Sequence, residues 1–122
     1  MGTINDFTEI IAWQKAEDLA IKLRECLELN KDFSYCDQIR RASLSIMNNI
    51  AEGYGRYGSR EFRQFLSIAK GSDLEVQSML YLGKKLQYFD QNKFEELMRL
   101  THDINNLLKA LIRSIQVNRK SE

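Results

Sequence analysis

Residues 90–115, DQNKFEELMRLTHDINNLLKALIRSI, decide the fold. Their apolar positions recur at intervals of three and four, as in Phe94, Ile104, Leu108 and Ile115. This period places apolar side chains on one face of an α-helix. Asp90 stands where a helix N-cap is expected, because its carboxylate can accept a hydrogen bond from the first turn. The stretch therefore predicts a long amphipathic helix that buries one side.

Three earlier segments carry the same period and predict helices over about residues 6–29, 34–53 and 59–89. Asp6 and Glu9 have the spacing of a capping box at the start of the first helix, and Ser34 repeats that signal for the second. Ser59 is expected to cap the third helix. No run alternates strictly between apolar and polar residues, so strands are not expected.

The predicted fold class is therefore all-α. Four helices with short connections favour antiparallel neighbours and an up-down four-helix bundle. The chain has 122 residues and no proline, and we expect residues 1–122 to form a single domain.

Small and amide residues suggest how the helices meet. Gly53 is expected to cap the second helix with a positive φ. Gly71 lies inside the third helix, where glycine costs about 1 kcal/mol relative to alanine, so it is expected to mark a close approach between helices, with a bend in the helix as the alternative. Asn48 and Asn49 are expected to bond across helices or to a neighbouring subunit, because buried amides find protein partners.

Composition narrows the classes of function. The net charge of +1 gives no long-range attraction to nucleic acid or acidic membranes, so such binding needs a local patch. No signal peptide and no membrane span are recognisable, and we expect a cytoplasmic protein without membrane contact. Cys26 and Cys36 are expected to be reduced thiols. With His102 as the only histidine, neither a metal nor a cofactor is expected.

Two motifs resemble catalytic or cofactor signals. Residues 53–58, GYGRYG, match G-x-G-x-x-G, but a dinucleotide loop follows a strand and here a helix precedes it. Arg99 occupies the position three before His102 where a di-iron bundle has glutamate. A lone histidine does not make a catalytic triad. The sequence therefore predicts a protein that is not an enzyme.

Basic residues concentrate between positions 40 and 63, where five arginines stand against two acidic residues. The candidate nucleic-acid-binding residues are Arg40, Arg41, Arg56, Arg60 and Arg63, with Tyr54 and Tyr57 interleaved and Lys70 as an extension. Arginine contacts phosphate and tyrosine stacks on bases. The alternative is ion pairing, either of Arg41 with Glu52 or Glu75, or of the arginines at a subunit interface.

Three stretches carry a resemblance to a known family. They are residues 38–53 (QIRRASLSIMNNIAEG), residues 61–72 (EFRQFLSIAKGS) with Glu75 after them, and residues 13–16 (WQKA). Together they resemble the bacterial four-helix bundle family of 23S rRNA intervening-sequence proteins. That family is similar to the accessory protein of diversity-generating retroelements.

The resemblance implies a ring-like homopentamer of antiparallel bundles and a role in binding ribosomal RNA or a retroelement ribonucleoprotein. Three hypotheses remain open. The first is a homo-oligomer that binds RNA or DNA through the arginine cluster. The second is a protein-interaction scaffold, such as a companion of a reverse transcriptase, in which the arginines pair with acidic groups. The third is an enzyme or cofactor carrier.

Overall fold

The computed structural model describes residues 4–56 and 58–121, with side chains described as far as Ile115. In this part the chain forms a short 3-10 helix, η1, and four α-helices, and it contains no strand. Their bounds are Phe7–Glu9 (η1), Ile11–Cys26 (α1), Phe33–Tyr54 (α2), Ser59–Lys85 (α3) and Gln91–Ser121 (α4). The prediction of an all-α four-helix fold is confirmed.

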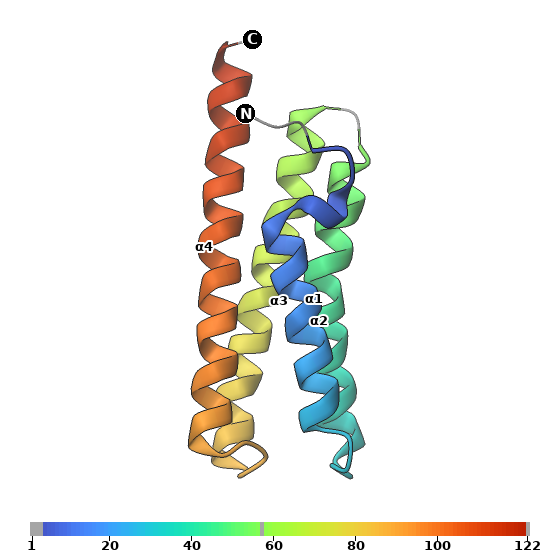
Figure 1. Cartoon of the computed structure of the whole chain (residues 1–122), viewed down its shortest axis with the longest axis vertical. Coiled ribbons are helices and arrows are strands. Elements are labelled where there is room, and N and C mark those ends of the chain that lie inside the picture. Colours follow the sequence, from blue (N-terminus) through green and yellow to red (C-terminus); the bar gives the residue numbers. More distant parts are fainter. Residues whose placement is uncertain (1–3, 57, 122) are drawn as a thin grey trace.

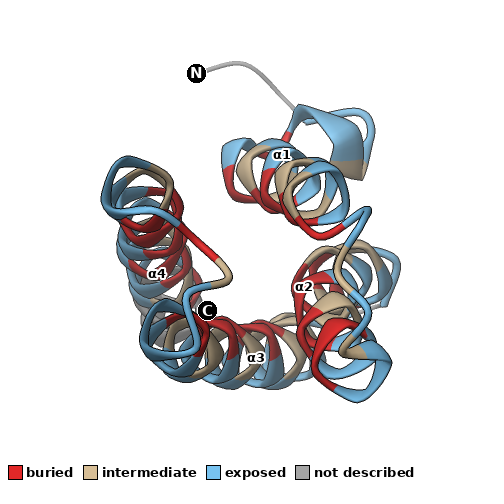
Figure 2. Ribbon diagram, turned by 90° about the horizontal axis from the view of Figure 1, so that it is seen from below, coloured by how far each residue is buried: buried red, intermediate tan, exposed pale blue. Residues whose placement is uncertain are grey.

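The helices run up and down in chain order, and their connections alternate between the two ends (Figure 1). α1 packs against α2 and α4, and α3 packs against the same two helices. Seen along the bundle, each helix turns its buried side inward (Figure 2). The fully buried large side chains come from all four helices and include Leu19, Leu23, Ile39, Ile46, Ile50, Leu66, Leu80, Leu97, Ile104 and Leu108. Each such burial contributes roughly 1.5–3 kcal/mol.

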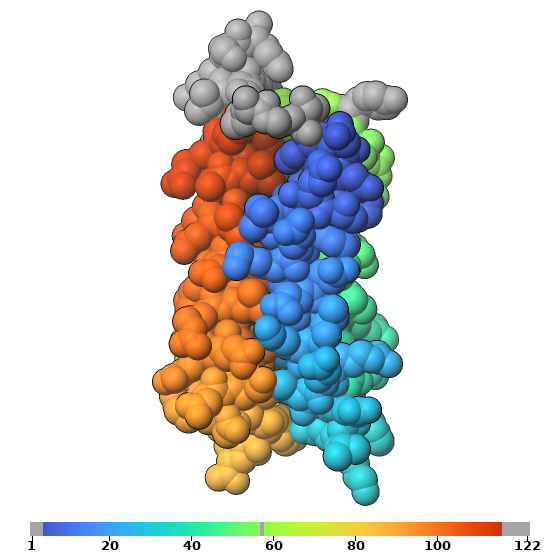
Figure 3. Space-filling model, in the orientation of Figure 1, coloured from blue at the N-terminus to red at the C-terminus, as the bar shows by residue number. Residues whose placement is uncertain are grey.

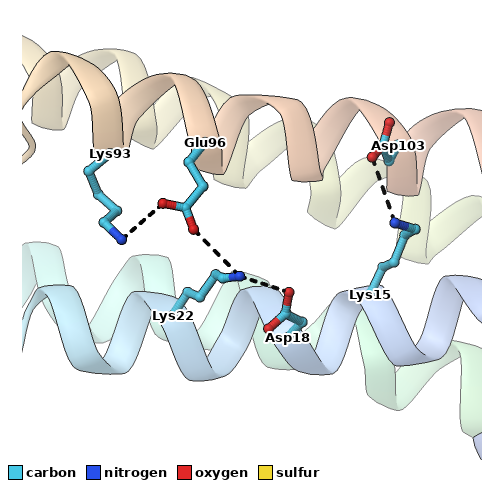
Figure 4. A network of polar contacts seen from close by, with 6 residues as sticks. All are labelled: Lys15, Asp18, Lys22, Lys93, Glu96 and Asp103. Carbon is cyan, nitrogen blue, oxygen red and sulfur yellow. Dashed lines mark hydrogen bonds and ion pairs between the residues drawn. The ribbon is translucent and has the colours of Figure 1, made fainter.

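α1 and α4 meet along a continuous seam on the outside of the bundle (Figure 3). Lys22 lies 3.5 Å from Glu96, and Lys93 lies 3.0 Å from the same carboxylate. Farther along, Lys15 lies 3.7 Å from Asp103 (Figure 4). The hydrogen bond from Lys93 lowers the pKa of Glu96. Because these pairs are exposed, they stabilise the fold little. The pairs Lys22–Glu96 and Lys15–Asp103 orient α1 on α4, whereas Lys93–Glu96 lies within α4.

The first helix begins later than predicted. Asp6 caps η1 instead, since its Oδ1 accepts from the backbone N–H of Thr8 at 3.2 Å. Glu9 Oε2 accepts from the N–H of Asn5 at 2.8 Å. The spacing of Asp6 and Glu9 therefore marks a 3-10 turn, and α1 itself begins at Ile11.

The caps of α2 and α4 differ in how well the sequence indicated them. Asp32, and not Ser34, caps α2, because its Oδ1 accepts from the N–H of Tyr35 at 3.2 Å. Asp90 caps α4 as predicted, accepting from the N–H of Lys93 at 2.7 Å.

α3 ends before Phe89, where the apolar pattern suggested its end. Gln87 has φ 63° and its N–H donates to Lys84 O at 3.0 Å. The N–H of Tyr88 donates to Gly83 O at 2.8 Å. This pair of bonds is a Schellman motif with glutamine at the left-handed position. The boundary escaped the sequence reading because that position usually carries glycine.

The glycine predictions were wrong in detail. Gly53 lies inside α2, where a Cβ would be 2.7 Å from Phe65 Cβ, so it serves close helix packing and not a positive φ. Gly83 does the same, since a Cβ there would lie 2.5 Å from the ring of Phe89. A Cβ on Gly71, in contrast, would meet nothing within 4 Å among the described residues.

The adjacent asparagines form no hydrogen bond to another helix among the described residues. Asn48 is exposed, and Asn49 Nδ2 donates at 2.8 Å to Ser45 O in its own helix. The contact across helices is made by serines instead: Ser45 Oγ lies 2.7 Å from Ser72 Oγ of α3.

A carboxyl group lies inside the bundle. Asp73 is fully buried; its Oδ2 accepts from Gln77 at 3.0 Å, and its Oδ1 has no hydrogen-bond partner among the described residues. Burial raises the pKa of Asp73 to about 7, although the amides of Gln77 and Asn105 oppose the shift. The neutral acid is the form that the fold favours.

Asp73→Asn should raise the free energy of unfolding near pH 8 by about 2–4 kcal/mol and change it little near pH 4. Because the pKa is higher in the folded chain, the wild type is most stable below about pH 4 and loses this contribution as the pH rises towards 7. Urea unfolding of both chains at several pH values measures the difference. A difference that stays constant from pH 4 to pH 8 would contradict the assignment.

Gly83→Ala should lower the free energy of unfolding by about 1–3 kcal/mol, because the added methyl group overlaps Phe89 and Tyr35. Gly55→Ala is the matched control, since a Cβ there meets only ordinary contacts and φ is −76°. Thermal unfolding of the two variants checks this. Equal stability would show that the α3 end adjusts freely.

Candidate nucleic-acid interface

Arg56, in the connection between α2 and α3, is engaged within the chain. Its Nη2 lies 2.8 Å from Glu52 Oε1, and its guanidinium lies 5.2 Å from the centre of the Phe65 ring. The side chain is still about half exposed, at 48%. The positive charge of Arg56 is therefore partly neutralised by Glu52 in the absence of a ligand.

Tyr54 is likewise used internally. Its hydroxyl donates to Ile4 O at 2.7 Å, and its ring packs edge-to-face on Phe62 with centroids 6.2 Å apart. These contacts hold the N-terminal segment against the bundle and leave the ring half-buried. Tyr57, the other tyrosine predicted to stack on bases, lies outside the described residues.

Arg40 and Arg41 do not lie at the α2–α3 end. α2 continues to Tyr54, and Arg41 stands 15 positions before Arg56, about 22 Å along the axis. Arg41 is exposed on the outer face, whereas Arg40 turns towards α1, where its Nη2 donates to Leu27 O at 3.4 Å. The structure thus divides the predicted arginine cluster into separate surfaces.

Arg60 and Arg63 lie in the first turns of α3, and Lys70 follows on the same side two turns after Arg63. Arg63 lines a shallow depression of about 510 Å³ together with Ile68 and Ile112 of α4. The N-terminal half of α3 and the C-terminal half of α4 therefore share one surface.

Two cations on α4 extend this surface. Lys109 and Arg113 are exposed and stand three positions before and one position after Ile112. We call the combined set the α3–α4 basic face, made of Arg60, Arg63, Lys70, Lys109 and Arg113. None of the five forms an ion pair within the described residues. Sequence reasoning missed Lys109 and Arg113 because only helix packing brings them beside Arg63.

A second feature, with two arginines and the glutamates Glu17, Glu25 and Glu28, lies between α1 and α2. Two adjoining pockets, of about 310 and 290 Å³, are both lined by Arg24 and Arg40. We call them together the α1–α2 groove. The Nε of Arg40 is buried and has no hydrogen-bond partner in the described part of the chain. Arg24 was also missed, because it stands outside residues 40–63, where the arginines concentrate.

Other classes of site receive no support from the geometry. The described residues contain no group of three or more His, Cys, Asp or Glu side chains placed to hold a metal ion. Nor is any helix in that part of the chain both long and apolar enough to cross a bilayer.

Comparison with known proteins gives the family. The sequence matches the model of the 23S rRNA-intervening sequence protein family over residues 8–110. The chain belongs to this family. The match includes four members of the α3–α4 basic face and ends just before Arg113.

One similar solved structure is a Bacteroides thetaiotaomicron protein of unknown function from the S23 ribosomal protein family. It is 24% identical, covers 84% of this chain and 96% of its own, and has a TM-score of 0.79. At that identity the likeness concerns the fold. No curated protein matches the sequence. The resemblance to the intervening-sequence family is confirmed, and the similarity to the retroelement accessory protein stays a prediction.

Proposed function

We propose that this chain is a non-catalytic, homo-oligomeric protein that binds nucleic acid through the α3–α4 basic face. The observation that carries the proposal is the set of five cations that form no ion pair within the described residues. Cations without internal partners are free to displace the counterions of phosphate groups, which drives binding to nucleic acids.

RNA is the nucleic acid to test first, since the family is described by its link to intervening sequences of 23S rRNA. With a net charge of +1, one copy is expected to bind weakly. A homo-oligomer repeats the basic face, and linked weak contacts add through avidity. The pentamer that the family resemblance implies would present the face five times.

The geometry changes the proposed roles of the sequence candidates. Arg60, Arg63 and Lys70 remain as phosphate contacts. Arg56 becomes a secondary contact because Glu52 already pairs with it. Tyr54 becomes a structural residue because its hydroxyl holds Ile4.

A protein-interaction scaffold, such as an accessory subunit of a reverse transcriptase, is the second candidate. The observation that favours it is the number of large apolar side chains exposed on α3: Ile68, Leu74, Tyr81, Leu82 and Leu86. Apolar side chains gathered on one helix are typical of surfaces that bind protein.

Arg63→Gln with Lys109→Gln should weaken binding to a labelled structured RNA about tenfold or more at low salt. It should also reduce the slope of log affinity against log salt by about 1.5–2, as expected for two lost phosphate contacts. Fluorescence anisotropy at several salt concentrations measures both quantities.

The matched control is Lys31→Gln with Arg41→Gln, which removes the same charge from exposed positions elsewhere. The control should keep the wild-type slope. If both double variants lose affinity equally, net charge and not the α3–α4 basic face determines binding. Wild-type protein that binds no RNA at any salt concentration would overturn the proposal and favour the scaffold.

A further inference from the structure

The α1–α2 groove contains guanidinium groups that lack acceptors. Arg40 has a buried Nε without a partner, and its Nη2 makes only a long bond of 3.4 Å to Leu27 O. Arg24, at the mouth, forms no ion pair within the described residues. A buried charged donor without an acceptor is unfavourable, and a carboxylate is its natural partner. The groove is therefore suited to an acidic group from outside the chain.

The chemistry changes along the groove. The pocket of about 310 Å³ is polar and is lined by Arg24, Arg40 and two glutamates. The adjoining pocket of about 290 Å³ extends towards the C-terminal end of α2 and is mostly apolar there. Its lining includes Ala20, Ile21, Leu44 and Met47, with Glu17 and Ser43 as polar members. A ligand that fills both pockets has an acidic group and, farther along, an apolar group.

The outer face of α3 carries an acidic group and an apolar group in this order. Ile68, Gly71, Glu75, Ser78 and Leu82 are all exposed and follow a spacing of alternating three and four, as in the seam of a coiled coil. Glycine at position 71 costs about 1 kcal/mol in a helix, and nothing within the described chain requires it there. A second helix surface that approaches closely would require it.

The groups on the two surfaces also match in their positions along the bundle axis. Gln38 Nε2 donates to Glu75 Oε2 at 2.6 Å, which sets Glu75 level with Gln38. Arg40 is only about 3 Å farther along α2 at 1.5 Å per residue. Ile68 lies about 10 Å from Glu75 in the direction of the C-terminal end of α2. Met47 lies a similar distance beyond Arg40 in that same direction.

We infer that the α1–α2 groove of one copy receives the outer face of α3 of a second copy. Glu75 of the second copy accepts hydrogen bonds from Arg24 and Arg40, and its Ile68 enters the apolar pocket. The complementary order of charge and apolar groups, at equal heights, favours this occupant. The inference rests on the proposed homo-oligomer and identifies the residues that hold it together.

This contact determines the form of the assembly. The helix pair α1–α2 and the outer face of α3 lie on different sides of the bundle (Figure 2), so a contact between them is head-to-tail. Because the matching groups have equal heights, successive copies are not displaced along the bundle axis. A repeat without such displacement forms a ring when the rotation between copies divides a full turn.

A charge exchange tests the contact. Glu75→Arg and Arg40→Glu, each alone, should weaken assembly at least 100-fold by placing like charges together, and the chain that carries both changes should regain much of the loss. Arg41→Glu is the control, with the same charge change on the outer face of the same helix. Sedimentation and light scattering across a dilution series give the mass, and circular dichroism checks that each variant is folded.

Gly71→Gln is a second variant that leaves the bundle itself unstrained, since a Cβ there meets open space. It should also lower the mass of the assembly. If the wild type is oligomeric and these variants keep its mass, or Arg41→Glu loses as much, the inferred contact is wrong while the homo-oligomer stands. A monomeric wild type overturns both. The α3–α4 basic face is judged separately by the chain that carries Arg63→Gln and Lys109→Gln, because variants that lose assembly also lose the avidity of repeated contacts.

Discussion

The register between α2 and α3 is the constraint on which the rest of the structure depends. At one end Gly53 lets the backbone of α2 approach Phe65, and at the other Gly83 makes room for Tyr35 and Phe89. Sliding either helix by one turn would place a side chain where only a hydrogen atom fits. The register therefore sets the position along the bundle axis of every functional side chain on these two helices.

Two kinds of cation result from this packing. Lys22, Lys93 and Arg56 have carboxylate partners supplied by their own helix or by the neighbouring one. The cations of the α3–α4 basic face and the two arginines of the α1–α2 groove have none within the described residues. Charges that folding leaves without partners are available for binding. We therefore propose that the α3–α4 basic face binds phosphate and that the arginines of the α1–α2 groove bind a carboxylate.

The glycines show the same contrast. Gly53 and Gly83 are explained by close packing inside the chain, whereas Gly71 has open space around it. We attribute Gly71 to the contact proposed between copies, because nothing among the described residues requires a glycine there. Asp73 is the opposite case, a polar group kept inside the bundle at a cost that depends on pH. Both residues depart from the simple pattern of an amphipathic helix.

Much of the fold could be predicted from the amino-acid sequence alone. The spacing of Phe94, Ile104, Leu108 and Ile115 determined a long amphipathic helix, the shorter patterns before it determined three more, and Asp90 was recognised as a cap. These signals are local, because a helix is defined by neighbours three and four positions apart. The end of α3 was missed because Gln87 occupies a position that glycine usually marks.

Only the tertiary structure decided which charges belong together. Arg40 and Arg63 looked like members of one cluster, yet they face different neighbours, and Lys109 joins Arg63 from another helix. Arg24 was not singled out, and Glu75 was considered as a partner of Arg41. Packing instead places Arg24 beside Arg40 and Glu75 beside Gln38. The physical reason is that charge pairing acts through space over a few ångströms, whereas sequence records only separation along the chain.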